Sequence, residues 1–471
     1  MKAFTQACVR FMRRFLPDAF IFVIILTIIV FLAAMKASGA SFLQMAMVWS
    51  SGMWGLLAFA MQMALVCVLG TALAKAPLVR GIIEWGASFA KTPSQGVMLT
   101  LVASATTTYL NWGFGLIVGA LFGRAVARKL KEAVDYPMLI AAAYTGFAVW
   151  HGGLSGSIPL QLNAAANLHP EKGMANTGGV VTQLIGTSET ILTSWNIIML
   201  IAFVVLAALV FGMSHPDPKD TLVANPKRLQ DAVRRYTKPV TPAEKLEDSA
   251  ILAMIIGMVG FVALFVLFFL KIKVNGVTWG RGMNALDLNT VNFLFLMLGL
   301  FLYGSPVRYA HAIMDAAANA SGIILQFPFY AGIQAMMLFA GGETGVSLAA
   351  VISLFFAEIS TATTFPLWTF LSAGIVNFFV PSGGAQWAVQ GPIMMPAGDV
   401  LHVKPAVTAM AIAWGDQWTN MVQPFWALPA LGIAGLGARD IMGYCVLGLL
   451  VMAVVGCVGF YAVGALGIAA V

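Results

Sequence analysis

Polar and glycine-rich segments interrupt the apolar runs of this chain, and they occur in two pairs. The first pair covers residues 111–115 and 150–159, and the second pair covers residues 377–390 and 416–424. Backbone that is not helical can lie at the depth of a lipid bilayer only where protein or a polar cavity satisfies its N–H and C=O groups. Paired interruptions of this kind, one pair in each half of a chain, are typical of the binding site of a transporter.

The apolar runs themselves predict an all-α polytopic membrane protein. Of the 471 residues, 60% are hydrophobic and only 10% are charged, and the mean hydropathy is +0.88, which is more apolar surface than a soluble fold can bury. The first run, from Leu16 to Met35, is long for a signal peptide and long enough to span, so we interpret it as a retained helix. We expect about nine spans, near residues 18–35, 53–74, 137–160, 189–212, 250–270, 290–303, 322–340, 406–431 and 441–463.

The distribution of Lys and Arg predicts the orientation of these spans. The net charge is +7, but the basic residues follow the loops and form no stripe with interleaved aromatic residues, so we expect no nucleic-acid partner. If the N-terminus lies in the cytoplasm, most of the 26 Lys and Arg residues fall on the cytoplasmic side, as positive charge in membrane proteins usually does. The C-terminus is then expected outside.

The only long polar stretch predicts a division of the chain into two repeats. Residues 214–248 are rich in Pro and mixed charge and are interpreted as a cytoplasmic linker. The first repeat is expected over residues 1–213 and the second over residues 249–471. Inverted repeats cross the membrane in opposite directions and need one additional span between them. The span at 250–270 is therefore expected to have no counterpart in the first repeat.

Each repeat is predicted to contain a re-entrant hairpin. The stretch 97–127 turns at a polar Asn-Trp-Gly sequence after a helix of only about 21 Å, against a hydrocarbon core of about 30 Å, and it is expected to enter from the cytoplasm. By the span count, the second hairpin, at 363–396, enters from outside. Amphipathic arms at 77–90 and 343–358 precede the two hairpins. The alternative for the first hairpin is one long bent span or two full spans.

The polar segments have the chemistry of a carboxylate site. Short helices that stop near the middle of the membrane present unpaired N–H groups and the positive end of the helix dipole to an anion. Glycines let the backbone approach a ligand, and amide side chains add donors and acceptors. Two alternatives stay open, because free carbonyl groups could ligate a cation such as Na⁺, and glycines also serve close helix packing.

Two ionisable residues within the predicted spans are candidates for coupling transport to an ion. Asp416 is the only carboxylate well inside a span, and His151 occupies the matching place in the first half. Ionisable groups at membrane depth are costly and usually functional. The alternatives are that Asp416 caps the next half-helix and that His151 is a hydrogen-bonded structural residue.

The tryptophans near the breaks are expected to wall an apolar pocket, although packing and interfacial roles are equally common for such residues. The predicted substrate-binding residues are Asn111, Trp112, Gly113, Trp150, Gly153, Ser155, Asn377, Ser382, Gly383, Gly384, Gln386, Trp387, Gln390, Gln417 and Asn420, and the predicted coupling residues are His151 and Asp416.

An enzymatic function is a weaker reading of the same segments. Gly153-Leu154-Ser155-Gly156 has the G-x-S-G form of intramembrane serine proteases, but such a string is expected by chance in a chain with 47 glycines, and the expected base lies on a separate helix. The sequence has no P-loop, metal-ligand spacing or nucleotide fingerprint. We therefore expect no enzyme, no metal and no cofactor, apart from H⁺ or Na⁺ as a coupling ion.

Longer strings of sequence carry a family resemblance. The most specific are Asn111-Trp112-Gly113-Phe114-Gly115-Leu116, Gln326-Phe327-Pro328-Phe329-Tyr330-Ala331-Gly332-Ile333-Gln334, Val380-Pro381-Ser382-Gly383-Gly384 with Trp387 and Gln390-Gly391-Pro392, and Gln423-Pro424-Phe425-Trp426-Ala427-Leu428-Pro429. On these strings the chain resembles the bacterial short-chain fatty acid transporter family of the acetoacetate/butyrate type. The likeness covers nearly the whole length.

The resemblance implies membership of the wider ion-transporter superfamily. It implies two inverted repeats, a homodimer held by scaffold spans, elevator-type movement and a bacterial inner-membrane location. It also implies that Asn111, Asn377 and the unwound parts at 150–158 and 416–423 line the substrate and cation sites. The chain departs from the Ser-Asn-Thr tips of the dicarboxylate carriers, because Trp112 and Phe378 follow its tip asparagines. Loss of the hydroxyl groups argues against sodium and suits a smaller, more apolar acid.

The sequence thus predicts a secondary transporter of short-chain monocarboxylates such as butyrate or acetoacetate, coupled to a proton or another cation. The carboxylate is expected between the hairpin tips, near Ser382, Gly383, Gly384 and Asn111. The alternatives are a carrier or exchanger of another small organic anion and, from a different class, an intramembrane serine protease.

Overall fold

The structure is a computed structural model, and it describes the whole chain except residues 1, 16–18, 164–166, 170–172, 175, 226–228, 230–238, 275–276, 281, 286–287 and 471. The predicted linker at 214–248 therefore falls partly outside the described residues.

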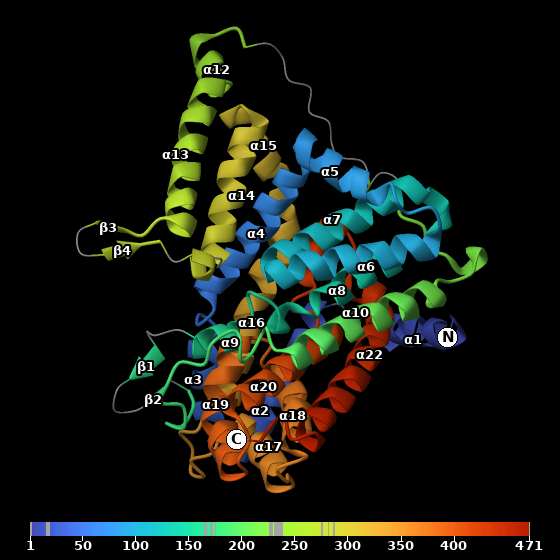
Figure 1. The fold of residues 1–471 in the computed structure, drawn as a ribbon. Coiled ribbons are helices and arrows are strands. Elements are labelled where there is room, and N and C mark those ends of the chain that lie inside the picture. The colour runs from blue at the N-terminus through green and yellow to red at the C-terminus, as the bar shows by residue number, and fades with distance from the viewer. Residues whose placement is uncertain are drawn as a thin grey trace.

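The described residues are mainly helical (Figure 1). Two short antiparallel strand pairs, β1 with β2 and β3 with β4, are additions that the all-α prediction lacks. The helices of the first half are α1 (Lys2–Phe15), α2 (Ala19–Ser38), α3 (Phe42–Gly52), α4 (Leu57–Lys75), α5 (Pro77–Ala87), α6 (Pro93–Leu110), α7 (Trp112–Leu130), α8 (Tyr136–Phe147), η2 (Trp150–Gly152), α9 (Ser157–Leu162) and α10 (Ser194–Ser214), with strands β1 (Leu168–His169) and β2 (Gly173–Met174).

The second half repeats much of this order after the linker. Its elements are α12 (Pro242–Glu247), α13 (Ala250–Phe269), β3 (Ile272–Val274), β4 (Val277–Trp279), α14 (Leu288–Tyr303), α15 (Pro306–Ala317), α16 (Ser321–Leu338), α17 (Leu348–Glu358), α18 (Phe365–Phe379), α19 (Gly383–Val400), α20 (Pro405–Thr419), η7 (Asn420–Val422), α21 (Leu428–Ala434) and α22 (Ala438–Ala465). Short 3₁₀ turns at 131–133, 218–220, 282–285 and 318–320 complete the described elements.

Long apolar helices make this a multi-pass membrane protein. Among the described residues, five helices are long and apolar enough to cross a bilayer, or six if one bent pair is a single span. The predicted spans at 53–74, 137–160, 290–303 and 406–431 consist instead of shorter or broken helices. The count of nine full spans and the elevator movement stay predictions. The five helices are Phe20–Ser38, Ser194–Ser214, Pro242–Phe269, Pro306–Leu338 and Ala438–Ala465.

The two predicted hairpins are helical hairpins, and the first has longer arms than expected. α6 and α7 pack along each other and turn at Asn111, so the alternative of one long bent span is wrong. α6 begins at Pro93, behind a capping box made by Thr92 and Gln95, and its 18 residues reach about 27 Å. The predicted boundaries at 97–127 are therefore too short. Asn377 lies in the last turn of α18, and the second turn is formed by residues 380–382.

Helix packing is paired, both between the halves and within each half. α2 packs on α16 while α4 packs on α14; α6 and α7 both pack on α8 while α18 and α19 both pack on α20 (Figure 1). Equivalent elements of two repeats would make such paired contacts. The division at the linker is not tested by them and stays a prediction.

Each half contains a broken span, formed by α8, η2 and α9 in the first half and by α20, η7 and α21 in the second. Each broken span is held at its start by the residues that follow the last long helix of the same half, which is α10 or α22. After α10, residues 215–222, the first strap, bond to the start of α8, where Tyr136 N donates to Leu222 O at 2.9 Å. After α22, residues 466–470, the second strap, bond to the start of α20, where Lys404 N donates to Ala469 O at 2.7 Å. Both broken spans are thus positioned from one end by main-chain hydrogen bonds.

Candidate functional site

The first broken span turns at a glycine that packs on the end of the first hairpin's leading helix. Leu154 N donates to Tyr109 O at 2.8 Å. A Cβ atom on Gly153 would lie 2.7 Å from the same carbonyl oxygen, closer than side-chain carbons approach. Gly153 therefore serves backbone packing, which is one of the two roles that the sequence leaves open for the glycines.

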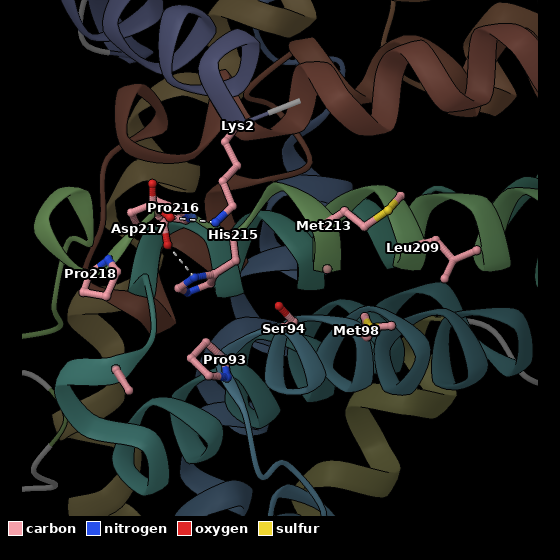
Figure 2. A pocket seen from close by; sticks show the side chains of 12 residues that line it. Lys2, Pro93, Ser94, Met98, Leu209, Met213, His215, Pro216, Asp217 and Pro218 are labelled. Atoms are coloured by element: carbon pink, nitrogen blue, oxygen red, sulfur yellow. Dashed lines mark hydrogen bonds and ion pairs between the residues drawn. The ribbon is translucent and has the colours of Figure 1, made fainter.

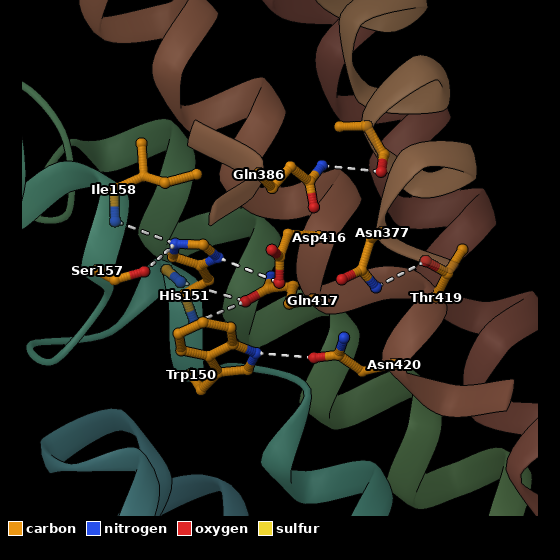
Figure 3. Close-up of polar contacts among 12 residues, drawn as sticks. Trp150, His151, Ser157, Ile158, Asn377, Gln386, Asp416, Gln417, Thr419 and Asn420 are labelled. Carbon is orange, nitrogen blue, oxygen red and sulfur yellow. Dashed lines mark hydrogen bonds and ion pairs between the residues drawn. The ribbon is translucent and has the colours of Figure 1, made fainter. Parts of the chain in front are cut away.

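His151 lies at the centre of this turn and is fully buried (Figure 3). Its Nε2 atom lies 3.1 Å from Ile158 N and 3.1 Å from Ser157 Oγ. The ring stacks on Trp150, with centroids 4.0 Å apart. Because a backbone N–H can only donate, Nε2 accepts this bond, and the neutral ring then carries its proton on Nδ1.

The Nδ1 atom of His151 faces Asp416 from the other half of the chain. The distance from Nδ1 to Asp416 Oδ1 is 3.5 Å, and both side chains are fully buried. The two carboxylate oxygens have no hydrogen-bond partner among the described residues. Asp416 lies inside α20 and caps no helix, so the capping alternative is wrong. A buried His–Asp pair of this kind is a candidate proton site.

Two amides of the second broken span bind the turn around His151. Gln417 Oε1 accepts from the backbone N–H groups of His151 and Gly152, at 3.0 and 3.2 Å. Asn420 Oδ1 accepts from Trp150 Nε1 at 3.0 Å. The amide nitrogens of Gln417 and Asn420 are buried and unpartnered among the described side chains. The second half thus completes the irregular backbone of the first half, and two of its amide nitrogens stay free.

The tip of the first hairpin is closed by its own chain. The first N–H group of α7, on Trp112, donates to Ser155 Oγ at 2.9 Å, and Phe114 N donates to Asn111 Oδ1 at 3.0 Å. Asn111 is therefore a helix cap, and Ser155 accepts from a backbone N–H of the same tip. Ser155 makes no hydrogen bond to His151, whose Nε2 bonds to Ser157 instead, so the arrangement of a serine protease is absent from these described residues.

The tip of the second hairpin is open. α19 begins at Gly383 behind Ser382, whose side chain makes no cap hydrogen bond. In the described part of the chain, no hydrogen bond is made by the N–H groups of Gly383, Gly384 or Ala385. These three N–H groups lie at the positive end of an 18-residue helix, which attracts anions.

This open helix end touches the His151 turn. A Cβ atom on Gly383 would lie 2.5 Å from His151 Cε1 and 2.4 Å from Ser157 Oγ. At the neighbouring Gly384, the nearest atom to such a Cβ is Gln161 Nε2, at 3.7 Å. The second hairpin therefore approaches the first broken span through one position that only glycine fits.

The amide side chains of the second hairpin form hydrogen bonds in two directions, toward α20 and toward the arm α17. Asn377 Nδ2 donates to Thr419 Oγ1 at 2.9 Å. Gln386 Nε2 donates to Gln390 Oε1 at 2.8 Å, and Gln390 Nε2 reaches Ser353 Oγ of α17 at 3.1 Å. Gln390 thus ties the hairpin to the arm α17, while its Oε1 atom bonds Gln386.

Three oxygen-bearing groups around the centre lack partners among the described residues: Asn377 Oδ1, Gln386 Oε1 and the Asp416 carboxylate. In Figure 3 these side chains extend from α18, α19 and α20 toward one region. Oxygen ligands of this kind suit a hard cation or an exchangeable proton. No cluster of three or more His, Cys, Asp or Glu that would hold a metal ion occurs in the described part of the chain.

The predicted aromatic wall is only partly assembled. Trp112 and Trp150 meet at 6.2 Å between ring centroids, and both contact Trp426, at 5.0 and 5.5 Å. Trp387 belongs to a separate buried cluster with Ile158. Trp426 completes the wall and was not among the predicted residues.

Sequence reasoning also missed a residue that joins the two broken spans. Asn196 on α10 is fully buried; its Nδ2 donates to Gly152 O at 3.0 Å, and its Oδ1 accepts from Trp414 Nε1 at 2.8 Å. A lone asparagine near the start of an otherwise apolar span is the sequence signal that would have found it. Ser157 and Ile158, which bond His151, carry no such signal.

A family model for short chain fatty acid transporters matches residues 1–463. The protein named "Putative short-chain fatty acid transporter" in Escherichia coli (strain K12) is 43% identical over 96% of this chain and 97% of its own length. A protein of the same name in Haemophilus influenzae is 40% identical over 96% and 97%. Among solved structures, the YdaH transporter of Alcanivorax borkumensis matches 96% of this chain and 98% of its own, with 14% identity and a TM-score of 0.43.

Proposed function

The chain belongs to the short-chain fatty acid transporter family, and from this we propose that it moves short-chain monocarboxylates such as butyrate or acetoacetate across the bacterial inner membrane. Membership makes it a transporter and not an enzyme. The substrate, the coupling and the membrane are parts of the proposal.

The substrate carboxylate binds at the open start of α19. The observation that carries this proposal is the set of three unpartnered N–H groups, on Gly383, Gly384 and Ala385, facing the His151 turn. A monocarboxylate needs few donors, and a helix end supplies them without a full positive charge in the membrane. Ser382 adds a hydroxyl group, whereas Asn111 already caps α7 and contributes to the first tip alone.

The acyl tail of the substrate lies toward the aromatic wall made by Trp112, Trp150 and Trp426. These rings supply apolar surface beside polar groups, which suits a molecule with one charged end and a short hydrocarbon end. A wall of three indoles also limits the length of the tail.

A proton accompanies the substrate through the His151–Asp416 pair. The pair joins the two halves, is closed to solvent, and lies beside the helix end that accepts the carboxylate. When His151 is protonated, Nε2 gains a proton that donates to Ser157 Oγ, and the bond from Ile158 N is lost. Binding of a carboxylate and a proton at adjacent positions would neutralise the charge that must cross the membrane.

The elevator movement, the homodimer, the cytoplasmic N-terminus and the outer C-terminus belong to the same proposal. Sodium coupling through the unpartnered oxygens of Asn377, Gln386 and Asp416 is the second candidate for the driving ion. Exchange of another small organic anion is the second candidate for the transport mode.

Uptake of labelled butyrate into proteoliposomes with imposed pH and Na⁺ gradients tests these points together. We expect uptake driven by an inward proton gradient and unaffected by Na⁺. Uptake that follows Na⁺ instead would assign the ion to the unpartnered oxygens. Absence of butyrate and acetoacetate uptake under every gradient, with the protein correctly inserted, would exclude the proposed substrate.

A further inference from the structure

The first helix of the chain is amphipathic and lies where three apolar spans reach one surface. α1 ends at Phe15, and α2 begins at Ala19. Along its length α1 packs on the start of α22, where a Cβ atom on Gly443 would lie 2.5 Å from Val9 Cα. At the N-terminal end of α1, Lys2 forms an ion pair with Asp217, which lies three residues after Ser214, the end of α10 (Figure 2). α1 therefore lies at the level where these spans leave the bilayer.

The sides of α1 have distinct chemistry. At about 100° per residue, Phe4, Phe11 and Phe15 fall within about 40° of one another on the helix surface. All three rings are exposed, at 50%, 59% and 62% of their surface. Beside them, Thr5 and Val9 form the buried side that packs on the protein. The phenylalanine stripe is thus apolar surface that the rest of the described chain does not cover.

The remaining side of α1 is cationic. The helix contains Lys2, Arg10, Arg13 and Arg14 and no acidic residue. At the same helical spacing, Arg10 and Arg14 fall on the arc between the valine side and the phenylalanine stripe, and Lys2 lies beside Val9 at the edge of that arc. Arg14 lies 5.6 Å from the ring centroid of Phe15, which places a cation directly at the edge of the apolar stripe.

From this arrangement we propose that α1 is an interfacial helix that binds the anionic phospholipid surface of the membrane. The phenylalanine stripe inserts at the boundary of the acyl chains, and the arginines contact lipid phosphates. Apolar aromatic residues on one face with Lys and Arg on the other are the composition of helices that lie in the plane of a bilayer. The charge distribution of the chain predicts that this surface is cytoplasmic, where anionic lipids attract basic segments.

The contacts of α1 give this binding a structural consequence. Lys2 holds Asp217 of the first strap, and His215 of the same strap accepts from the backbone N–H of Asp135 through Nε2, at 3.1 Å. Asp135 caps α8 by accepting from Met138 N at 2.9 Å. A chain of contacts therefore leads from the lipid-facing helix to the start of the first broken span.

An environment-sensitive fluorophore on α1 of the full-length protein tests the proposal. The label is attached at Ala7→Cys, next to the phenylalanine stripe, after Cys8→Ala and Cys457→Ala remove the two partly exposed thiols. The protein is reconstituted in phosphatidylcholine vesicles with an increasing fraction of phosphatidylglycerol. We expect the emission to shift to the blue as phosphatidylglycerol increases and to reverse in high salt, because lipid charge is screened.

Two sets of variants separate the contributions. Arg10→Gln with Arg14→Gln is expected to weaken the dependence on phosphatidylglycerol about fivefold per cation, and Phe4→Ser with Phe11→Ser to lower the shift at every lipid composition. Lys271→Gln with Lys273→Gln removes the same charge at exposed positions far from α1 and is the matched control. Emission that is independent of phosphatidylglycerol and of salt in the protein with native arginines would overturn the proposal, whatever the variants do.

Discussion

The two helical hairpins share an architecture but differ at their tips. The first tip is filled by its own chain, since Asn111 and Ser155 accept from the first N–H groups of α7. The second tip has no side-chain cap, and the first N–H groups of α19 face the His151 turn. A closed tip adds stability, while an open tip keeps donors available for a ligand. Under the proposed function, the first tip is structural and the second tip binds the substrate.

The two straps differ in a similar way. Besides its main-chain bond from Tyr136 N, the first strap holds α8 through a titratable side chain, because His215 Nε2 accepts from Asp135 N at 3.1 Å. The second strap holds α20 through main-chain carbonyl groups, which accept from Lys404 N and Lys404 Nζ at 2.7 and 3.1 Å. Only the first attachment should therefore respond to pH near neutrality.

The strongest test of the open tip is Gly383→Ala. Its Cβ atom would meet His151 Cε1 at 2.5 Å and Ser157 Oγ at 2.4 Å, so the helix end and the turn must move apart. We expect butyrate uptake to fall by about tenfold to a hundredfold, since overpacking of this kind costs about 1–3 kcal/mol. Initial rates of uptake in proteoliposomes measure the effect.

Gly384→Ala is the matched control for this substitution. The nearest atom to its Cβ is 3.7 Å away, an ordinary contact distance, so uptake should stay close to that of the unmodified protein. Equal losses in the two variants would mean that the helix end tolerates no side chain for reasons unrelated to His151. No loss in either would contradict the binding role of the second tip.

Substitution of either residue of the His151–Asp416 pair is expected to have the next largest effect on butyrate uptake. Asp416→Asn keeps the size of the side chain but removes its charge, and His151→Gln removes the ring that bonds Ile158 N. Each should reduce uptake driven by a proton gradient by about tenfold, because a buried partner is left without its counterpart. Exchange of labelled for unlabelled butyrate, which needs no net proton movement, should be less affected. Proton-driven uptake that survives both substitutions would remove the pair from coupling.

The two serines at the tips should separate stability from transport. Ser155→Ala removes the acceptor of Trp112 N, and the expected loss is about 1 kcal/mol of stability, seen as a lower thermal midpoint in detergent. Ser382→Ala removes no cap and should leave the midpoint unchanged while raising the KM for butyrate. The reverse pattern would show that the first tip is the binding tip.

The smallest effect concerns the first strap. Burial lowers the pKa of His215 below its usual value of about 6.5, with Lys2 acting in the same direction and the Pro216 carbonyl and Asp217 opposing it. The unfolded chain then binds more protons than the folded one as the pH falls below about 6.5, so stability decreases with acidification in that window. We expect the thermal midpoint to drop by about 1–2 °C between pH 7.5 and 5.5.

His215→Gln should flatten this pH dependence. Lys404→Met is the matched control, because it removes the side-chain bond of the second strap to Ile468 O and leaves His215 in place, so it should change the midpoint without changing its slope with pH. A pH dependence that persists unchanged in His215→Gln would place the titrating group elsewhere.

The sequence predicted the parts of the fold that follow from apolar length and from local breaks. The hairpin at Asn111, the broken segments and the arms α5 and α17 are found where glycines, prolines and polar clusters interrupt apolar runs. The start of α6 was missed because the capping box of Thr92 and Gln95 begins the helix before its apolar pattern does. Several predicted spans consist of shorter or broken helices because hydropathy does not register a turn inside an apolar run.

The sequence predicted several residues of the candidate site but not which of them contact one another. The sequence predicted His151, Asp416, Gln417 and Gly383 as site residues from their residue types. Only the fold shows that His151 contacts Asp416 and Gln417 from the other half of the chain. Gln386 and Gln390 lie one turn apart on the same side of α19, and only the fold shows that Gln390, one turn farther from the tip, bonds the arm α17. Asn111 was assigned to the ligand because capping and binding require the same side-chain oxygen, and sequence cannot separate these uses.

The hydrogen bonds between Gln417 and the His151 turn also bear on how the protein is made. The acceptor for the N–H groups of His151 and Gly152 is synthesised more than 260 residues after them. Until that segment has entered the bilayer, the first broken span carries unsatisfied donors in an apolar medium, where each costs several kcal/mol. The first half is therefore an incomplete folding unit during synthesis, and its final shape is reached only when the last third of the chain is inserted.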